Sequence, residues 1–163
     1  MSEDEKILWG NILDFNIDDP DSSFTFTDRL CRENDWSMEY ALRAILEYKK
    51  FMFLVCATQH SQTPSDQVDQ VWHLHLLYTQ SYWIEFCRNV LHRDVHHGPT
   101  KGVEEQGLYK DQYAHTLEQY SKKFNELPPS DIWPDPDKRI SEIHFTRVNR
   151  HRNWIIPKMK WRK

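Results

Sequence analysis

The fold is decided by one stretch near the middle of the chain, which runs from residue 66 to residue 91 and reads DQVDQVWHLHLLYTQSYWIEFCRNVL. The residues before it, Thr63-Pro64-Ser65, are typical of a helix start, because proline fits the first turn and a serine hydroxyl accepts a hydrogen bond from a free amide. The loop after it contains Gly98 and Pro99, which end helices. We therefore expect a single helix from Asp66 to about Leu91.

The sequence on either side of this stretch also favours helices. The 163 residues include only 4 glycines, and no segment alternates apolar and polar residues for long enough to predict a strand. Leu, Glu, Lys and Gln are frequent, as in helices. We expect further helices over residues 4–15, from about residues 23–27 onward, from the turn at residues 34–37 to about residue 60, and over residues 104–124. The prediction is an all-α, single-domain bundle of about five helices within residues 1–137.

The C-terminal part of the chain has a different composition. Four prolines between residues 127 and 136 exclude a long helix there, so we expect an extended, proline-rich strap that buries the indole of Trp133. Residues 138–163 carry nine Lys or Arg against one Glu, whereas residues 1–137 carry a net charge of −12, because the whole chain carries −4. We expect this basic tail to pack on the acidic domain; the alternative is an arm for an anionic partner.

The composition excludes several classes of protein. The apolar share of 39% and the charged share of 28% are those of a packed globule, not of a disordered or collagen-like chain. The longest apolar run, residues 51–57, is far shorter than the roughly 20 residues of a membrane-spanning helix. The acidic start of the chain is unlike a signal peptide. We expect a soluble, cytoplasmic protein with no membrane partner. The three cysteines are too widely spaced for a disulfide framework or a zinc knuckle.

Histidines gather in and after the central stretch. Of nine histidines in the chain, five lie between residues 73 and 97, and neutral histidine is a common metal ligand. Asp69 and His73 are four residues apart, so they share one face of a helix and can bind the same ion. His75 lies about 200° away from His73 around the helix, so the two cannot bind the same ion on an unbroken helix.

The remaining ligands must come from elsewhere in the chain. The adjacent pair His96 and His97 can fold back beside the helix; the alternative is that both are turn and surface residues. His75 faces apolar neighbours, which leaves open a neutral buried imidazole or a ligand in the bundle core. We take Asp69, His73 and His97 as the ligands, with His75 or His96 as a fourth ligand or a supporting group. Two histidines and one carboxylate with open positions are typical of catalytic Zn or nonhaem Fe(II).

The same residues resemble a known family. The chain resembles the glycine-rich domain-containing protein-like family, in the short stand-alone form found in bacteria. The resemblance implies a D-x-x-W-H-x-H signature at Asp69, Trp72, His73 and His75, with a downstream histidine at His96 or His97. The glycine-rich region of the plant members has no counterpart here, so its functions are not implied. The matching segments are residues 26–34, 64–83, 96–102, 131–134 and 153–158, together with Cys87, Tyr113, Thr116, Tyr120 and Phe124.

Two functions follow from these observations. The first is a metal-binding protein, with the question of an enzyme left open, that acts on an unidentified small molecule or protein. Zn suggests hydrolysis and Fe(II) suggests oxidation. The second is a noncatalytic interaction module, in which the histidines form a buried polar network and the tail from Arg147 to Lys163 binds a protein or single-stranded nucleic acid. The acidic domain repels phosphate, which disfavours nucleic acid.

Overall fold

A computed structural model describes residues 1–98, 106–141, 148 and 152–156 of the chain. These residues form helices and no strand, which confirms the all-α prediction. The helices, in chain order, are α1 (Glu3–Asp14), α2 (Phe26–Asn34), α3 (Met38–Ala57), α4 (Asp66–Leu77), the π-helix η1 (Gln80–Arg88), α5 (Gln106–Phe124) and α6 (Pro136–Ser141). The described residues thus contain seven helices, and the expected count of about five is too low.

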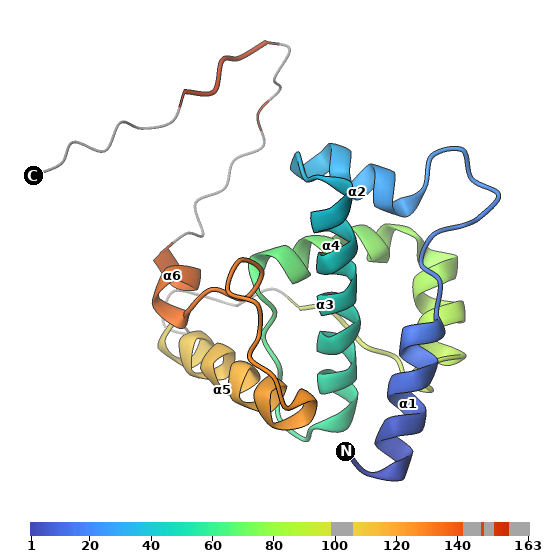
Figure 1. The fold of residues 1–163 in the computed structure, drawn as a ribbon, viewed down its shortest axis with the longest axis vertical. Coiled ribbons are helices and arrows are strands. Elements are labelled where there is room, and N and C mark those ends of the chain that lie inside the picture. The colour runs from blue at the N-terminus through green and yellow to red at the C-terminus, as the bar shows by residue number, and fades with distance from the viewer. Residues whose placement is uncertain (99–105, 142–147, 149–151, 157–163) are drawn as a thin grey trace, which may run out of the picture.

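The longest helix, α3, lies at the centre and is contacted by α1, α2, α4 and α5 (Figure 1). Local chemistry fixes where the helices begin. The side chains of Ser2 and Thr25 form capping boxes with Glu5 and Asp28, and Ser37 and Ser65 accept a hydrogen bond from the first turns of α3 and α4. The polar residues at these starts therefore satisfy amides that have no partner within the helix.

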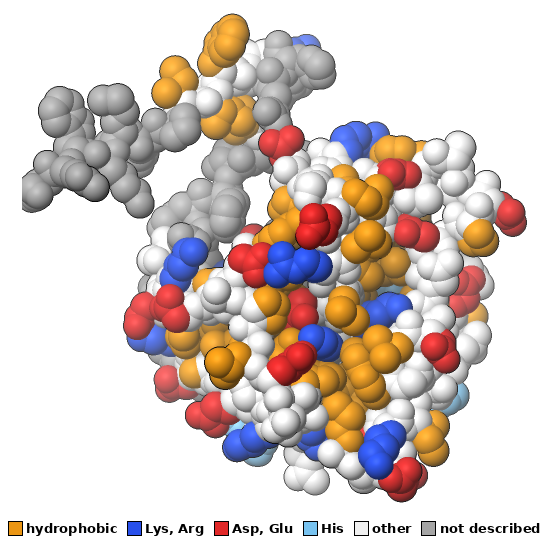
Figure 2. All heavy atoms as spheres, in the orientation of Figure 1, with side chains coloured by type: hydrophobic (Ala, Val, Ile, Leu, Met, Phe, Trp, Pro, Cys, Tyr) orange, Lys and Arg blue, Asp and Glu red, His pale blue; other side chains and the backbone are white. Residues whose placement is uncertain are grey.

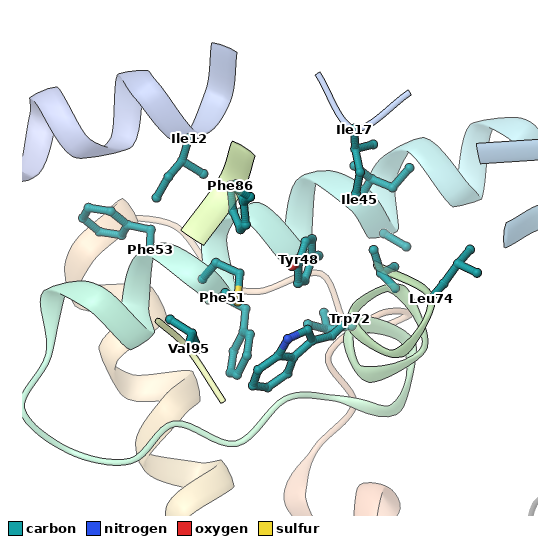
Figure 3. Close-up of a cluster of buried hydrophobic side chains, with 14 of the residues drawn as sticks. Ile12, Ile17, Ile45, Tyr48, Phe51, Phe53, Trp72, Leu74, Phe86 and Val95 are labelled. Carbon is teal, nitrogen blue, oxygen red and sulfur yellow. The ribbon is translucent and has the colours of Figure 1, made fainter. Parts of the chain in front are cut away.

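The core lies between α3 and the helices around it (Figure 3). Tyr48, Phe51 and Phe53 of α3 are at most 1% exposed, and they meet Ile12 of α1 and Phe86 of η1. This apolar burial supplies most of the stabilisation of the fold, because burying a large apolar side chain contributes about 1.5–3 kcal/mol.

The expected single helix from Asp66 to Leu91 is wrong. It breaks at Tyr78, whose amide donates to the carbonyl of His75, and it continues as the π-helix η1 in a new direction (Figure 1). The reason is packing. The rings of His75 and Phe86 lie 5.5 Å apart, whereas residues eleven positions apart on a straight helix are separated by about 16 Å. The break lets both helices bury aromatic side chains in the same core.

The proline-rich segment after α5 is a series of turns rather than an extended strap, and it leads into the short helix α6. Trp133 within it is 2% exposed, as predicted. Its indole donates to Glu47 Oε2 over 2.8 Å, and Arg43 pairs with Asp131 at the same distance. A buried hydrogen bond and a surface ion pair therefore attach this segment to α3, in addition to apolar packing.

Most of the predicted basic tail, residues 138–163, lies outside the described residues. The prediction that this tail packs on the domain therefore also falls outside the described part of the chain. Helix α6 contains the first residues of this tail, and Trp154 and Ile156 are 96% and 83% exposed. On the face shown in Figure 2, hydrophobic side chains remain exposed among acidic and basic ones. None of the described helices is long and apolar enough to span a bilayer.

Candidate metal centre

Three side chains converge at one place on the surface of α4. Asp69 Oδ1 lies 2.8 Å from His97 Nε2, and Asp69 Oδ2 lies 3.9 Å from His73 Nε2. The imidazole rings of His73 and His97 have centroids 4.6 Å apart. One potential ligand atom from each residue lies within 4.8 Å of the other two. The described structure therefore brings together the three residues that the sequence singled out as the ligands.

The backbone explains this convergence. Asp69 and His73 stand one turn apart on α4, whose start is capped by Ser65. His97 comes from the chain that follows η1, 28 positions after Asp69. Its ring packs edge-on against Trp72, with centroids 4.4 Å apart. Trp72 thus supports His97 from the same helix that carries the other two groups.

Tyr82 holds the segment before His97 in place. Its buried hydroxyl accepts a hydrogen bond from Trp72 Nε1 over 2.8 Å and donates one to the carbonyl oxygen of Val95. Val95 is itself 5% exposed, so its carbonyl needs a partner within the protein. These two hydrogen bonds, from Trp72 to Tyr82 and from Tyr82 to Val95, connect α4, η1 and the segment that carries His97.

The site is accessible from one side. The side chains of Asp69 and His97 are 19% and 18% exposed, whereas that of His73 is 50% exposed. Asp66 lies one turn before Asp69, and burial raises the pKa of its carboxyl, with a further rise from the charge of Asp69 and an opposing effect from Arg139. The carboxyl of Asp66 interacts electrostatically with both Asp69 and His73, so a cation bound by these residues would also interact with Asp66.

His75 lies elsewhere, in the core. It is 0% exposed; its Nδ1 lies 2.9 Å from the Tyr48 hydroxyl, and its Nε2 lies 3.2 Å from Ser81 Oγ. Burial lowers the pKa of this imidazole to about 3, so the ring is neutral at physiological pH. Of the two alternatives, the structure places it as a buried imidazole with both nitrogens bonded to hydroxyls, and outside the cluster around Asp69.

His96 also lies outside the cluster. Its side chain points to Trp83, with ring centroids 5.3 Å apart, and the residue is exposed. His92 adopts a positive φ of 54° and its Nδ1 lies 3.1 Å from the carbonyl oxygen of Arg88, so it ends the turn after η1. Neither imidazole has a nitrogen in the group formed by Asp69, His73 and His97.

Sequence reasoning missed the residues that hold this site together. The sequence pattern assigns no partner to the hydroxyl of Tyr82, and it does not connect Ser81 or Tyr48 to His75. Spacing along one straight helix gives no sign of these contacts, because they depend on the break at Tyr78. A usable signal was the density of hydroxyl groups beside buried aromatics, since a buried hydroxyl must find a partner.

The donor set has the chemistry of a divalent metal site. Imidazole nitrogens suit Zn and Fe, and a carboxylate lowers the charge of the bound ion. Three protein ligands leave coordination positions for water or substrate, as in catalytic sites. In the same geometry without an ion, His97 Nε2–H donates a hydrogen bond to Asp69, because an ionised carboxylate only accepts hydrogen bonds. Metal and proton thus compete for one position.

Comparison with known proteins identifies the family of the chain and corrects one expectation. No curated protein and no solved structure matches it. The family whose model matches is the UCP032817-like family, over residues 25–125. The resemblance to the glycine-rich domain-containing protein-like family, with its bacterial stand-alone form, is therefore wrong. The matched residues cover more than half of the chain and include all three residues of the cluster, and the chain belongs to the UCP032817-like family.

Proposed function

We propose that the protein binds one divalent transition metal ion, Zn or Fe(II), through Asp69, His73 and His97, and that the open coordination positions make it a metal-dependent enzyme. The observation that carries this proposal is the approach of one ligand atom from each residue to within 4.8 Å of the others. Two of these residues come from one turn of α4 and the third from a distant part of the chain.

The exposure of the three residues supports metal binding over a purely structural network. A network that only stabilises the fold gains most where its members are buried. His75 has that role, with two hydroxyl partners and no exposure. His73 does not, because half of its side chain is exposed and its nearest acidic oxygen is 3.9 Å away. A metal ion gives the nitrogen of His73 a partner that the described residues do not supply at hydrogen-bond distance.

The role of the surrounding residues follows from the same geometry. Asp69 and His97 bind the ion on its buried side, and His73 binds it on the side that faces solvent. Tyr82 and Trp72 hold His97 in place, which matters because supporting partners typically change metal affinity by 10- to 100-fold. A metal at this position activates a bound water or polarises a substrate oxygen.

Elemental analysis tests the proposal. Protein purified without added metal should retain about one equivalent of Zn or Fe per chain. The double variant Asp69→Ala with His73→Ala should lose this metal while circular dichroism shows the same helix content. His96→Ala is the matched control, since it removes a neighbouring exposed histidine that lies outside the cluster; it should keep the metal.

Two results would contradict the proposal. One is wild-type protein that binds neither Zn nor Fe(II) after removal of adventitious ions and re-addition in titrations. The other is a double variant that still holds one equivalent. In that case the contact between Asp69 and His97 is a structural hydrogen bond, and the noncatalytic interaction module is the better description.

A further inference from the structure

We propose that the cleft between the α1–α2 segment and the start of η1 binds a small organic cation through an ammonium group. The cleft has a volume of about 780 Å³, within the range of small-molecule sites. It is formed by residues 16–26 on one side and residues 78–85 on the other, two parts of the chain that lie on the same side of the molecule in Figure 1. This proposal does not depend on metal binding.

The charges that line the cleft are of one sign. Asp18, Asp19 and Glu85 line it, and none of the described lining residues is Lys, Arg or His. Asp18 is fixed in place, because its two oxygens accept hydrogen bonds from the amide and the hydroxyl of Thr27 over 2.8 and 2.7 Å. A carboxylate oxygen accepts more than one hydrogen bond, so the fixed carboxylate still attracts a cation.

Aromatic rings supply the second element of the site. Phe24, Phe26 and Tyr78 line the cleft, and Phe24 is 40% exposed although it is apolar. Aromatic faces attract cations, most strongly where water is partly excluded. Guanidinium groups outside the lining already lie over two of these rings, Arg32 at 4.8 Å from the centroid of Phe24 and Arg29 at 5.8 Å from that of Tyr78, so a ligand cation has to use the ring surface that faces the cleft.

The combination selects the ligand class. Carboxylates alone would suit any cation, and aromatic rings alone would suit any apolar group. A quaternary or primary ammonium on a short carbon chain satisfies both, because its charge faces the carboxylates while its carbon atoms contact the rings. None of Asp69, His73 and His97 lines the cleft. It is therefore a separate site from the metal cluster.

Titration calorimetry and NMR shift mapping with the full chain test this proposal. The probes are choline and ethanolamine, and the control ligand is 3,3-dimethylbutan-1-ol, which has the shape of choline without its charge. We expect both cations to bind, and to shift the amide signals of residues 18–26 and 78–85, and the neutral alcohol to bind much more weakly. The affinity should be the same for metal-loaded and chelator-treated protein, so this result is independent of the proposed metal site.

Variants separate charge recognition from folding. The double variant Asp19→Asn with Glu85→Gln removes two exposed carboxylates without removing volume, and should weaken choline binding about fivefold or more. Glu118→Gln is the control, because Glu118 is an exposed residue of α5 outside the cleft. The proposal is overturned if neither cation binds at millimolar concentration, if the neutral alcohol binds equally well, or if the double variant keeps the wild-type affinity.

Discussion

His73 and His75 are two residues apart on α4, yet they have opposite surroundings. The side chain of His73 is 50% exposed beside Asp69, and His75 is 0% exposed against Tyr48 and Ser81. The helical period predicts this separation, because residues two positions apart lie on nearly opposite faces. It does not predict the partners of His75, since Tyr48 comes from α3 and Ser81 reaches His75 only because the helix breaks at Tyr78.

At this scale, the burial of His75 predicts a pH dependence of stability. The unfolded chain takes up a proton here below about pH 6.5, but the folded protein does so only near its pKa of about 3. The unfolded state therefore binds more protons between these values, so the free energy of unfolding falls as the pH falls from 6.5 to 3. Above pH 6.5 the contribution of His75 is constant.

The measurement is urea unfolding at a series of pH values, with a chelator present in all samples. His75→Gln has no titrating ring, so its stability should change less between pH 6.5 and pH 4 than that of the wild type. Tyr48→Phe is the control, because it removes one hydrogen bond but keeps the buried imidazole. Parallel pH profiles for wild type and His75→Gln would show that His75 does not titrate differently in the two states.

Among the helices, the bend between α4 and η1 does most to build the site. It brings Tyr82 within hydrogen-bond distance of Trp72 and of the carbonyl oxygen of Val95. The sequence predicted helix content on both sides of Tyr78 but not the bend. The apolar spacing in residues 66–91 suits one α-helix, and the tight turn at Tyr78 has no proline or glycine to mark it.

Tyr82→Phe tests this role. The ring remains, so the core stays filled, but the Val95 carbonyl loses its donor and the indole of Trp72 loses its acceptor. We expect the affinity for the metal to fall about tenfold and the free energy of unfolding to fall by about 1–3 kcal/mol. Competition with a coloured chelator gives the affinity, and urea unfolding gives the stability.

Tyr113→Phe is the matched control for that variant. Tyr113 is also 0% exposed, and its hydroxyl donates to a carbonyl, that of Pro134, over 2.8 Å. It should lose similar stability without any change in metal affinity. Equal affinities for the two variants would mean that Tyr82 does not position His97.

For the whole molecule, the segment between α5 and α6 connects distant parts of the fold. Trp133 donates to Glu47, and Glu47 is 4% exposed beside Lys50, whose ammonium lies 2.9 Å from its Oε1 and 2.6 Å from Glu126 Oε1. The prolines predicted the absence of a long helix, and the burial of Trp133 is confirmed. A carboxylate on α3 as the indole's partner could not be predicted, because Glu47 is 86 positions away in the chain.

Trp133→Ala should therefore destabilise the protein strongly. It removes a large buried side chain and leaves Glu47 without one of its donors, and such changes cost about 3–5 kcal/mol. Leu127→Ala, in the same segment but at a residue that is 85% exposed, should change the stability by less than about 0.5 kcal/mol. Thermal unfolding of both variants gives the comparison. Similar melting temperatures for the two would contradict the anchoring role of Trp133.

The wide separation of Asp69 and His97 along the chain has one more consequence. A metal ion bound to both residues would close the intervening stretch into a loop, as a disulfide bond does, and would lower the conformational entropy of the unfolded chain. That stretch contains Arg93, an exposed target for trypsin. Stripping the ion with a chelator should then speed cleavage at Arg93, while cleavage after Lys6 in α1 keeps its rate.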